Sequence, residues 1–73
     1  MVYTRIRDLR EDADLKQSDM ADILHITQQA YSNYERGLRD IPTDILINIA
    51  SFHKTNVDYI LGLTNNRNYY KKI

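Results

Sequence analysis

The 73-residue chain is long enough for one small domain with a single hydrophobic core. Ten basic and ten acidic side chains give a formal net charge of zero, and a composition of 42% hydrophobic and 27% charged residues is that of a soluble globular domain. The sequence has no cysteine, which excludes disulfides, thiolate zinc sites and cysteine nucleophiles. No apolar run approaches the ~20 residues that cross a bilayer, and the charged N-terminus has no signal segment, so we expect a cytoplasmic protein without a membrane partner.

Two short helices are predicted in the first third of the chain. Residues 3–13 read as a helix because apolar side chains recur at helical spacing, at Val2, Ile6, Leu9 and Ala13. Residues 17–24 read as a second helix with one apolar and one polar stripe. The apolar stripe consists of Met20, Ala21, Ile23 and Leu24.

A third helix is predicted to begin after Thr27, whose hydroxyl can cap its N-terminus, and to end near Arg36. Gly37 follows and can take the left-handed conformation that ends a helix. With residues placed at 100° intervals, the polar side chains fill one arc of about 140° without an apolar residue among them. They are Gln28, Gln29, Ser32, Asn33 and Arg36, opposite Ala30, Tyr31 and Tyr34.

Two more helices complete an all-α prediction. Pro42 suits the first turn of a helix over residues 43–53, which is apolar almost all round and is therefore expected to be the central buried element. Asn56 can cap a last helix that ends at Leu61, with Gly62 beyond it. The remaining TNNRNYYKKI is polar and rich in tyrosine, and we expect it to be frayed or ordered only by a partner.

The polar arc of the third helix has an unusual composition for a face that serves only solubility. Such faces usually carry Glu and Lys, which favour helix formation and pair at i,i+4 spacing. Amides, a hydroxyl and a guanidinium are the groups that bind base edges and phosphates in a DNA groove. Periodicity alone shows only that these side chains share a face, so a solvated face and a reading face both stay open.

The stretch LKQSDMADILHITQQAYSNYERG resembles the helix-turn-helix of the lambda-repressor/Cro-like family, also called XRE-type. Gln17 opens the second helix, Ala21 is the small residue that lets two helices cross closely, and Y-E-R-G closes the third helix. A downstream ILINIA followed by VDYILGL is also typical. The resemblance covers about residues 5–63. It implies a five-helix DNA-binding domain over residues 1–64, with the helix-turn-helix at about 17–36 and a C-terminal tail over 65–73.

The resemblance also implies roles for individual residues. The third helix is expected to enter the major groove of double-stranded DNA while the second lies across the backbone. The expected base-reading residues are Gln28, Gln29, Ser32 and Asn33. The expected phosphate contacts are Lys16, Gln17, Thr27, Arg36 and Arg39. Arg10 and Glu35 match a pair that joins the first helix to the end of the recognition helix, which we interpret as scaffold.

Several positions depart from the family pattern. His25 stands where the family favours Gly, and it tolerates the left-handed region at some cost. Lys16 replaces the usual Ser or Thr cap, so the second helix is expected to be less well capped. Lys54 also stands where Gly is common. Tyr31 and Tyr34 replace aliphatic residues and must find partners for their hydroxyls.

The tyrosine-rich end of the chain has two interpretations. Its residues can pack on the first or fourth helix, or they can form a homodimer interface, because aromatic residues are enriched in such patches. We expect a homodimer formed through Tyr59, Ile60, Tyr69 and Tyr70.

Enzymatic and sensor functions are not expected. His25 and His53 lack further ligands at metal-binding spacing, no Gly-rich phosphate loop is present, and a small bundle offers little room for a catalytic pocket. We expect no cofactor, no metal and no small-molecule effector. The resemblance, together with the polar arc of the third helix, implies a sequence-specific DNA-binding transcriptional regulator that acts as a repressor. The alternative is an antitoxin-like or anti-repressor module that binds a protein, which the zero net charge favours.

Overall fold

A computed structural model describes residues 2–69 of the chain as five helices without a strand among them, which confirms the predicted all-α class. The helices are α1 (Thr4–Asp12), α2 (Gln17–Leu24), α3 (Gln28–Glu35), α4 (Thr43–Phe52) and α5 (Val57–Leu61). Their bounds lie within one residue of the predicted ones. None of them is long and apolar enough to span a membrane.

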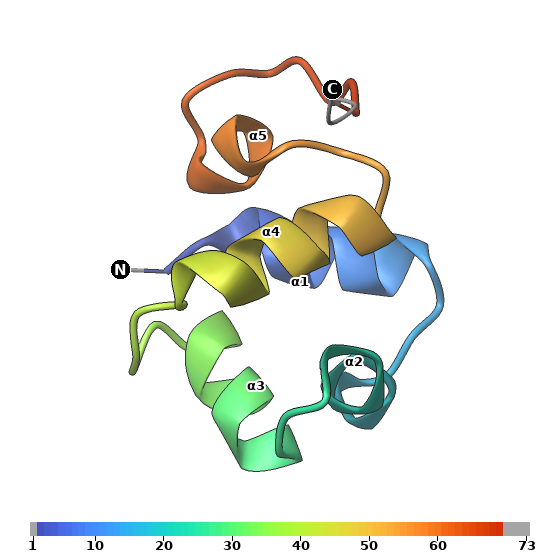
Figure 1. The fold of residues 1–73 in the computed structure, drawn as a ribbon, viewed down its shortest axis with the longest axis vertical. Helices are drawn as coiled ribbons and strands as arrows, with labels where there is room; N and C mark the ends of the chain where they lie inside the picture. The colour runs from blue at the N-terminus through green and yellow to red at the C-terminus, as the bar shows by residue number, and fades with distance from the viewer. Residues whose placement is uncertain (1, 70–73) are drawn as a thin grey trace.

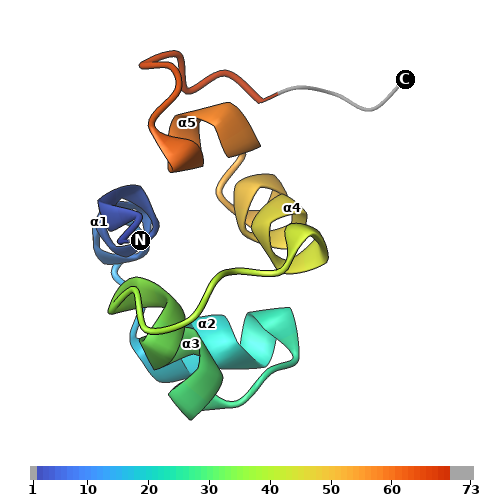
Figure 2. The ribbon, with the colours of Figure 1, turned by 90° about the vertical axis from the view of Figure 1, so that its left-hand side faces the viewer.

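α2 and α3 lie at one end of the molecule (Figures 1 and 2). α5 and the segment after it lie at the opposite end, with α1 and α4 between them (Figures 1 and 2). Each helix contributes one of the largest fully buried side chains to a shared core: Ile6, Met20, Tyr31, Ile49 and Ile60. The core therefore fixes α3 against the other helices through Tyr31, on the side opposite its polar arc.

All five helices end in the same way. Each is followed by a residue with positive φ, and the next amide reaches back five residues to a helix carbonyl, as in a Schellman motif. At the end of α2, for example, the Ile26 amide donates to the Ala21 carbonyl at 3.0 Å while His25 has φ 58°. The residues with positive φ are Asp14, His25, Gly37, Lys54 and Gly62.

The prediction that α4 is the central buried element is correct for only part of its surface. Ile45, Ile49 and Ala50 lie in the core, but Ile47 is 44% exposed and Phe52 is 41% exposed. α2 and α5 both pack against α4 but cover only part of its surface. Two large apolar side chains of α4 are therefore left exposed.

The expectation of a frayed tail is wrong for residues 64–69, which we call the C-terminal strap. Arg5 of α1 donates to the carbonyls of Tyr59 at 2.7 Å and Thr64 at 2.6 Å, and to the Asn65 side chain at 2.7 Å. Its guanidinium also lies 4.1 Å from the centre of the Tyr59 ring. One arginine thus ties the strap to the first helix.

Asn56 holds the strap from the other side. Its Oδ1 caps α5 by accepting the Tyr59 amide at 2.8 Å, as predicted. Its Nδ2 donates to the carbonyls of Asn66 at 2.9 Å and Asn68 at 2.7 Å. Asn56 is only 3% exposed, so these bonds satisfy a buried amide as well as ordering the strap.

Candidate nucleic-acid interface

The outer face of α3 brings the four expected base-reading residues together. Gln28 and Gln29 are exposed and Ser32 and Asn33 are half-buried, while Tyr31 lies fully inside the core. The Thr27 hydroxyl accepts the Ala30 amide at 3.1 Å and so caps the helix, as predicted. The polar arc is therefore carried by a helix whose other side and first turn are both fixed.

Two of the base-reading candidates are bonded to each other. Gln29 Nε2 donates to Asn33 Oδ1 at 3.2 Å, one helical turn further along. The two residues are four apart in the sequence, a spacing at which helical side chains can meet. The sequence interpretation nevertheless treated the two residues as separate readers, because spacing does not show which way two amides turn.

An ion pair connects the far end of α3 to α1. Arg10 Nε donates to Glu35 Oε2 at 2.7 Å and its Nη2 to Glu35 Oε1 at 3.1 Å, so the contact is bidentate. Arg10 also donates to the Leu15 carbonyl at 2.8 Å. The Arg10 and Glu35 side chains are 12% and 3% exposed. The pair expected from the sequence is thus in contact inside the molecule.

Gln17, at the start of α2, joins the same pair. Its Nε2 donates to Glu35 Oε1 at 3.1 Å. Gln17 was expected to contact phosphate, but one N–H of its side-chain amide is already bonded within the protein. This bond joins the start of α2 to the end of α3, which Arg10 already joins to α1.

The surroundings of Glu35 shift the pKa of each group in the cluster. Burial acts to raise the pKa of Glu35, but hydrogen bonds from Arg10 and Gln17 and the Arg10 charge outweigh it, so the pKa is lowered. The bond to Glu35 raises the pKa of Arg10. Burial raises the pKa of the Tyr31 phenol far above its ordinary value, and the neighbouring Glu35 acts in the same direction. Glu35 is thus charged and Tyr31 neutral.

The Tyr31 hydroxyl is fully buried and has no partner of good hydrogen-bond geometry among residues 2–69. The Glu35 carboxylate lies beside the hydroxyl and favours its neutral form. The carboxylate beside it already accepts three N–H groups from Arg10 and Gln17.

Glu35 is the only acidic residue in α3, and it points into the molecule. The outer face of the helix therefore carries amides and a hydroxyl without a negative charge. Three cationic residues expected at phosphates have exposed side chains: Lys16 at the start of α2, Arg36 at the end of α3, and Arg39 in the loop that follows. Such a face suits a polyanion even though the whole chain is neutral.

The start of α2 has no cap from the side chain of Lys16, as expected. The Asp19 carboxylate accepts the Lys16 amide at 2.8 Å, in the manner of a capping box, and places a negative charge in the first turn. The cap comes from inside the helix instead of from residue 16. The Lys16 side chain is left exposed to the solvent.

The expected dimer residues do not lie together on one surface. Ile60 is 1% exposed, so it belongs to the core and has no surface to offer a partner, which corrects the prediction. Tyr59 is half-buried between Arg5 and Arg67, whose guanidiniums lie 4.1 Å and 5.4 Å from its ring centre. Tyr70 lies outside the described residues. Only Tyr69, 43% exposed, is available as an apolar surface.

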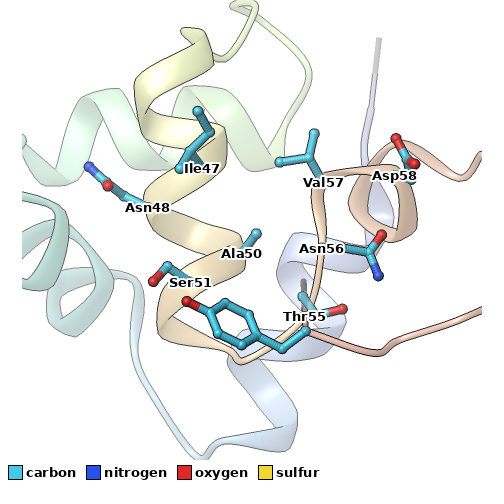
Figure 3. A pocket seen from close by; sticks show the side chains of 9 residues that line it. Ile47, Asn48, Ala50, Ser51, Thr55, Asn56, Val57 and Asp58 are labelled. Carbon is cyan, nitrogen blue, oxygen red and sulfur yellow. The ribbon is translucent and has the colours of Figure 1, made fainter. Parts of the chain in front are cut away.

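Tyr69 lines a pocket of about 390 Å³ between α4 and α5. Figure 3 shows Ile47 of α4 and Val57 of α5 facing each other across this space. We call it the α4–α5 pocket; its lining residues are Ile47, Asn48, Ala50, Ser51, Thr55, Asn56, Val57, Asp58 and Tyr69. The sequence interpretation missed it because it expected the Ile47 side of α4 to be buried.

No group of three His, Asp or Glu side chains within residues 2–69 is arranged to hold a metal ion. α2 and α3, joined by the turn at residues 25–27, define a helix-turn-helix whose second helix presents a polar face. A family model described as "Helix-turn-helix" matches residues 6–60. The chain belongs to the XRE-type helix-turn-helix family.

Three relatives from Bacillus subtilis (strain 168) show the same relationship. The chain is 36% identical over 58 residues to the HTH-type transcriptional regulator ImmR, covering 80% of this chain and 46% of that protein. It is 36% identical over 64 residues to the uncharacterized HTH-type transcriptional regulator YobD, covering 88% and 57%. It is 34% identical over 71 residues to the uncharacterized HTH-type transcriptional regulator YqaE, covering 97% and 61%. The chain thus spans about half to three fifths of their lengths.

Proposed function

We propose that the chain is a sequence-specific DNA-binding transcriptional regulator that inserts α3 into the major groove and acts as a repressor. The observation that carries the proposal is the acid-free outer face of α3, where Gln28, Gln29, Ser32 and Asn33 lie side by side. Amide and hydroxyl groups of this kind discriminate base edges, and the exposed cations beside them can bind phosphates. The names of the three relatives are consistent with this function.

The test is a selection of bound sequences from random duplexes, followed by affinity measurements on the preferred duplex. Gln28→Ala and Gln29→Ala should each relax the preference at particular positions by about 1–3 kcal/mol. Arg36→Ala should weaken binding to all sequences alike. Arg7→Ala removes the same charge from α1, where Arg7 pairs with Glu11, and serves as the matched control. If the glutamine variants select an unchanged sequence, the base-reading role is wrong.

The functional unit in this proposal is a homodimer. An eight-residue α3 is about 12 Å long and covers one half-site, whereas family-type operators have half-sites about 34 Å apart. The α4–α5 pocket, with exposed Ile47 and Tyr69, is the apolar surface that we propose for self-association. Sedimentation should detect dimers that Ile47→Asp disrupts. A monomer at high concentration, with and without the selected duplex, would remove this part of the proposal.

The second candidate is an antitoxin-like or anti-repressor module that binds a protein. Exposed acids on and just after α1 favour it, together with the zero net charge. They are Asp8, Glu11, Asp12 and Asp14. A shift of labelled duplex at low salt that disappears steeply as salt rises would decide for DNA binding.

A further inference from the structure

The hydrogen bond between Gln29 and Asn33 leaves the two side chains with different numbers of free N–H groups. Gln29 Nε2 donates one N–H to Asn33 Oδ1 at 3.2 Å. Gln29 then keeps one N–H and its carbonyl oxygen, while Asn33 keeps both of its N–H groups. Gln29 is the exposed member and Asn33 is half-buried nearer the helix body. Among residues 2–69, Gln28 and Ser32 have no comparable side-chain bond on this face.

The groups left to Gln29 match one base. In the major groove, adenine presents the N7 acceptor beside the N6 amino donor, which requires one donor and one acceptor from the protein. Guanine presents two acceptors, N7 and O6, and requires two donors. If both amides were turned over, Gln29 would accept from Asn33 and present two N–H groups, which suit guanine. The observed direction of the bond therefore favours adenine.

Building on the proposed function, we infer that Gln29 and Asn33 form one reading unit for a single A·T pair. Gln29 makes the bidentate contact: its free N–H donates to N7 and its carbonyl accepts from the N6 amino group. Asn33 is a positioning residue, because its Oδ1 holds the Gln29 amide in the orientation that adenine requires. Held in this way, the glutamine also loses less side-chain freedom when it binds.

The test uses the duplex that the wild-type protein selects, with all four base pairs placed at each position. Gln29→Ala should lower the preference for A·T at one position by about tenfold or more. Asn33→Ala should lower the preference at that same position and at no other, and the double variant should lose no more than Gln29→Ala alone. Gln28→Ala, which removes the neighbouring amide, should act at a different position.

Two further measurements separate positioning from general damage. Asn33→Asp keeps an oxygen that accepts the Gln29 N–H, so it should preserve the A·T preference even though its charge weakens binding to all duplexes. A duplex with 7-deazaadenine at the position lacks N7. It should weaken binding of the wild-type protein by part of the loss that Gln29→Ala shows, because the contact to the N6 amino group remains, and it should not weaken Gln29→Ala further.

The outcomes that contradict the inference differ from those that contradict DNA binding. If Asn33→Ala loses preference at another position, Asn33 reads its own base and the single unit is wrong. A preference for G·C at the Gln29 position would show that the amides face the other way. If the wild-type protein selects no sequence at all, the proposed function fails, and this inference fails with it.

Discussion

Glu35 is the acceptor at which three helices meet, because Arg10 of α1 and Gln17 of α2 both donate to it. A charge this deeply buried is stable only while its partners remain in place. The two bonds from Arg10 also set the position of the last turn of α3 relative to α1. The direction in which the outer face of α3 points is therefore set by contacts on its buried side.

Breaking this pair should cost stability. Glu35→Gln should lower the free energy of unfolding by about 2–4 kcal/mol, because it leaves Arg10 without its counter-charge in a mostly buried position. Arg10→Met should cost a similar amount. In urea unfolding, the double variant should lose at least ~1 kcal/mol less than the sum of the two single losses. Additive losses would show that the contact contributes nothing specific.

His53 makes stability depend on pH in the near-neutral range. Burial, with the nearby Arg67 charge, lowers its pKa below the ordinary 6.5, and its Nε2 is buried without a partner among residues 2–69. Below pH 6.5 the unfolded chain binds a proton that the folded chain does not, so stability is present above that pH and is lost as the pH falls.

Urea unfolding between pH 5 and 8 should therefore show declining stability toward the acid side, and His53→Gln should reduce the slope over about pH 5 to 7. The variant keeps a polar side chain of similar reach but has no group that titrates in this range. An unchanged slope would assign the pH dependence to other residues.

At the scale of elements, the five helices share one ending but not one residue type. Only Gly37 and Gly62 take the left-handed position without a Cβ penalty, whereas Asp14, His25 and Lys54 adopt φ of 56–58° at some cost. The fold therefore carries strain at three of its helix ends. At α2 this strain lies in the turn that precedes the recognition helix.

Relieving this strain should stabilise the domain. His25→Gly should raise the free energy of unfolding by about 0.5–1 kcal/mol, the amount left after the larger unfolded-state entropy of glycine is subtracted. Gly62→Ala is the reverse control. Nothing lies within 4 Å of the added Cβ, so its loss of about 1 kcal/mol would measure the backbone alone. A destabilised His25→Gly would show that the imidazole makes a contact worth more than the strain.

The elements also show what the sequence can predict. Helix bounds were predicted to within one residue because caps, periodicity and the residue that ends each helix are local signals. The strap was not predicted, because the bond from Arg5 to the Thr64 carbonyl joins residues 59 positions apart. The α4–α5 pocket was missed for a similar reason: whether the apolar side chains of α4 are covered depends on elements elsewhere in the chain.

In the candidate site, too, some features could be predicted from the sequence and others could not. Periodicity placed the polar arc on one face, and the family resemblance supplied the Arg10–Glu35 contact. The bond between Gln29 and Asn33 depends on how two side chains turn, which no local pattern fixes.

For the whole molecule, the proposed phosphate contacts of Lys16, Arg36 and Arg39 set the expected salt dependence, even though the net charge is zero. In the proposed homodimer, three cations in each protomer would make roughly six phosphate contacts, so the logarithm of the binding constant should fall with the logarithm of salt with a slope of about −5. Arg36→Ala should reduce the slope by about 2, since the contact is lost from both protomers. A slope near −3 would indicate that one protomer binds alone, and a slope near zero would contradict the phosphate contacts.

The hydrogen bonds that Arg5 donates affect how this end of the molecule unfolds locally. Because one guanidinium holds the carbonyls of Tyr59 and Thr64 and the side chain of Asn65, unwinding the first turn of α1 breaks contacts to the strap and to the end of α5 at the same time. Three segments that would each fray separately therefore form one cooperative unit, whose amides should exchange with solvent at a common rate. That unit lies at the end of the molecule away from α3 (Figures 1 and 2), so we expect it to open and close while α3 stays in place.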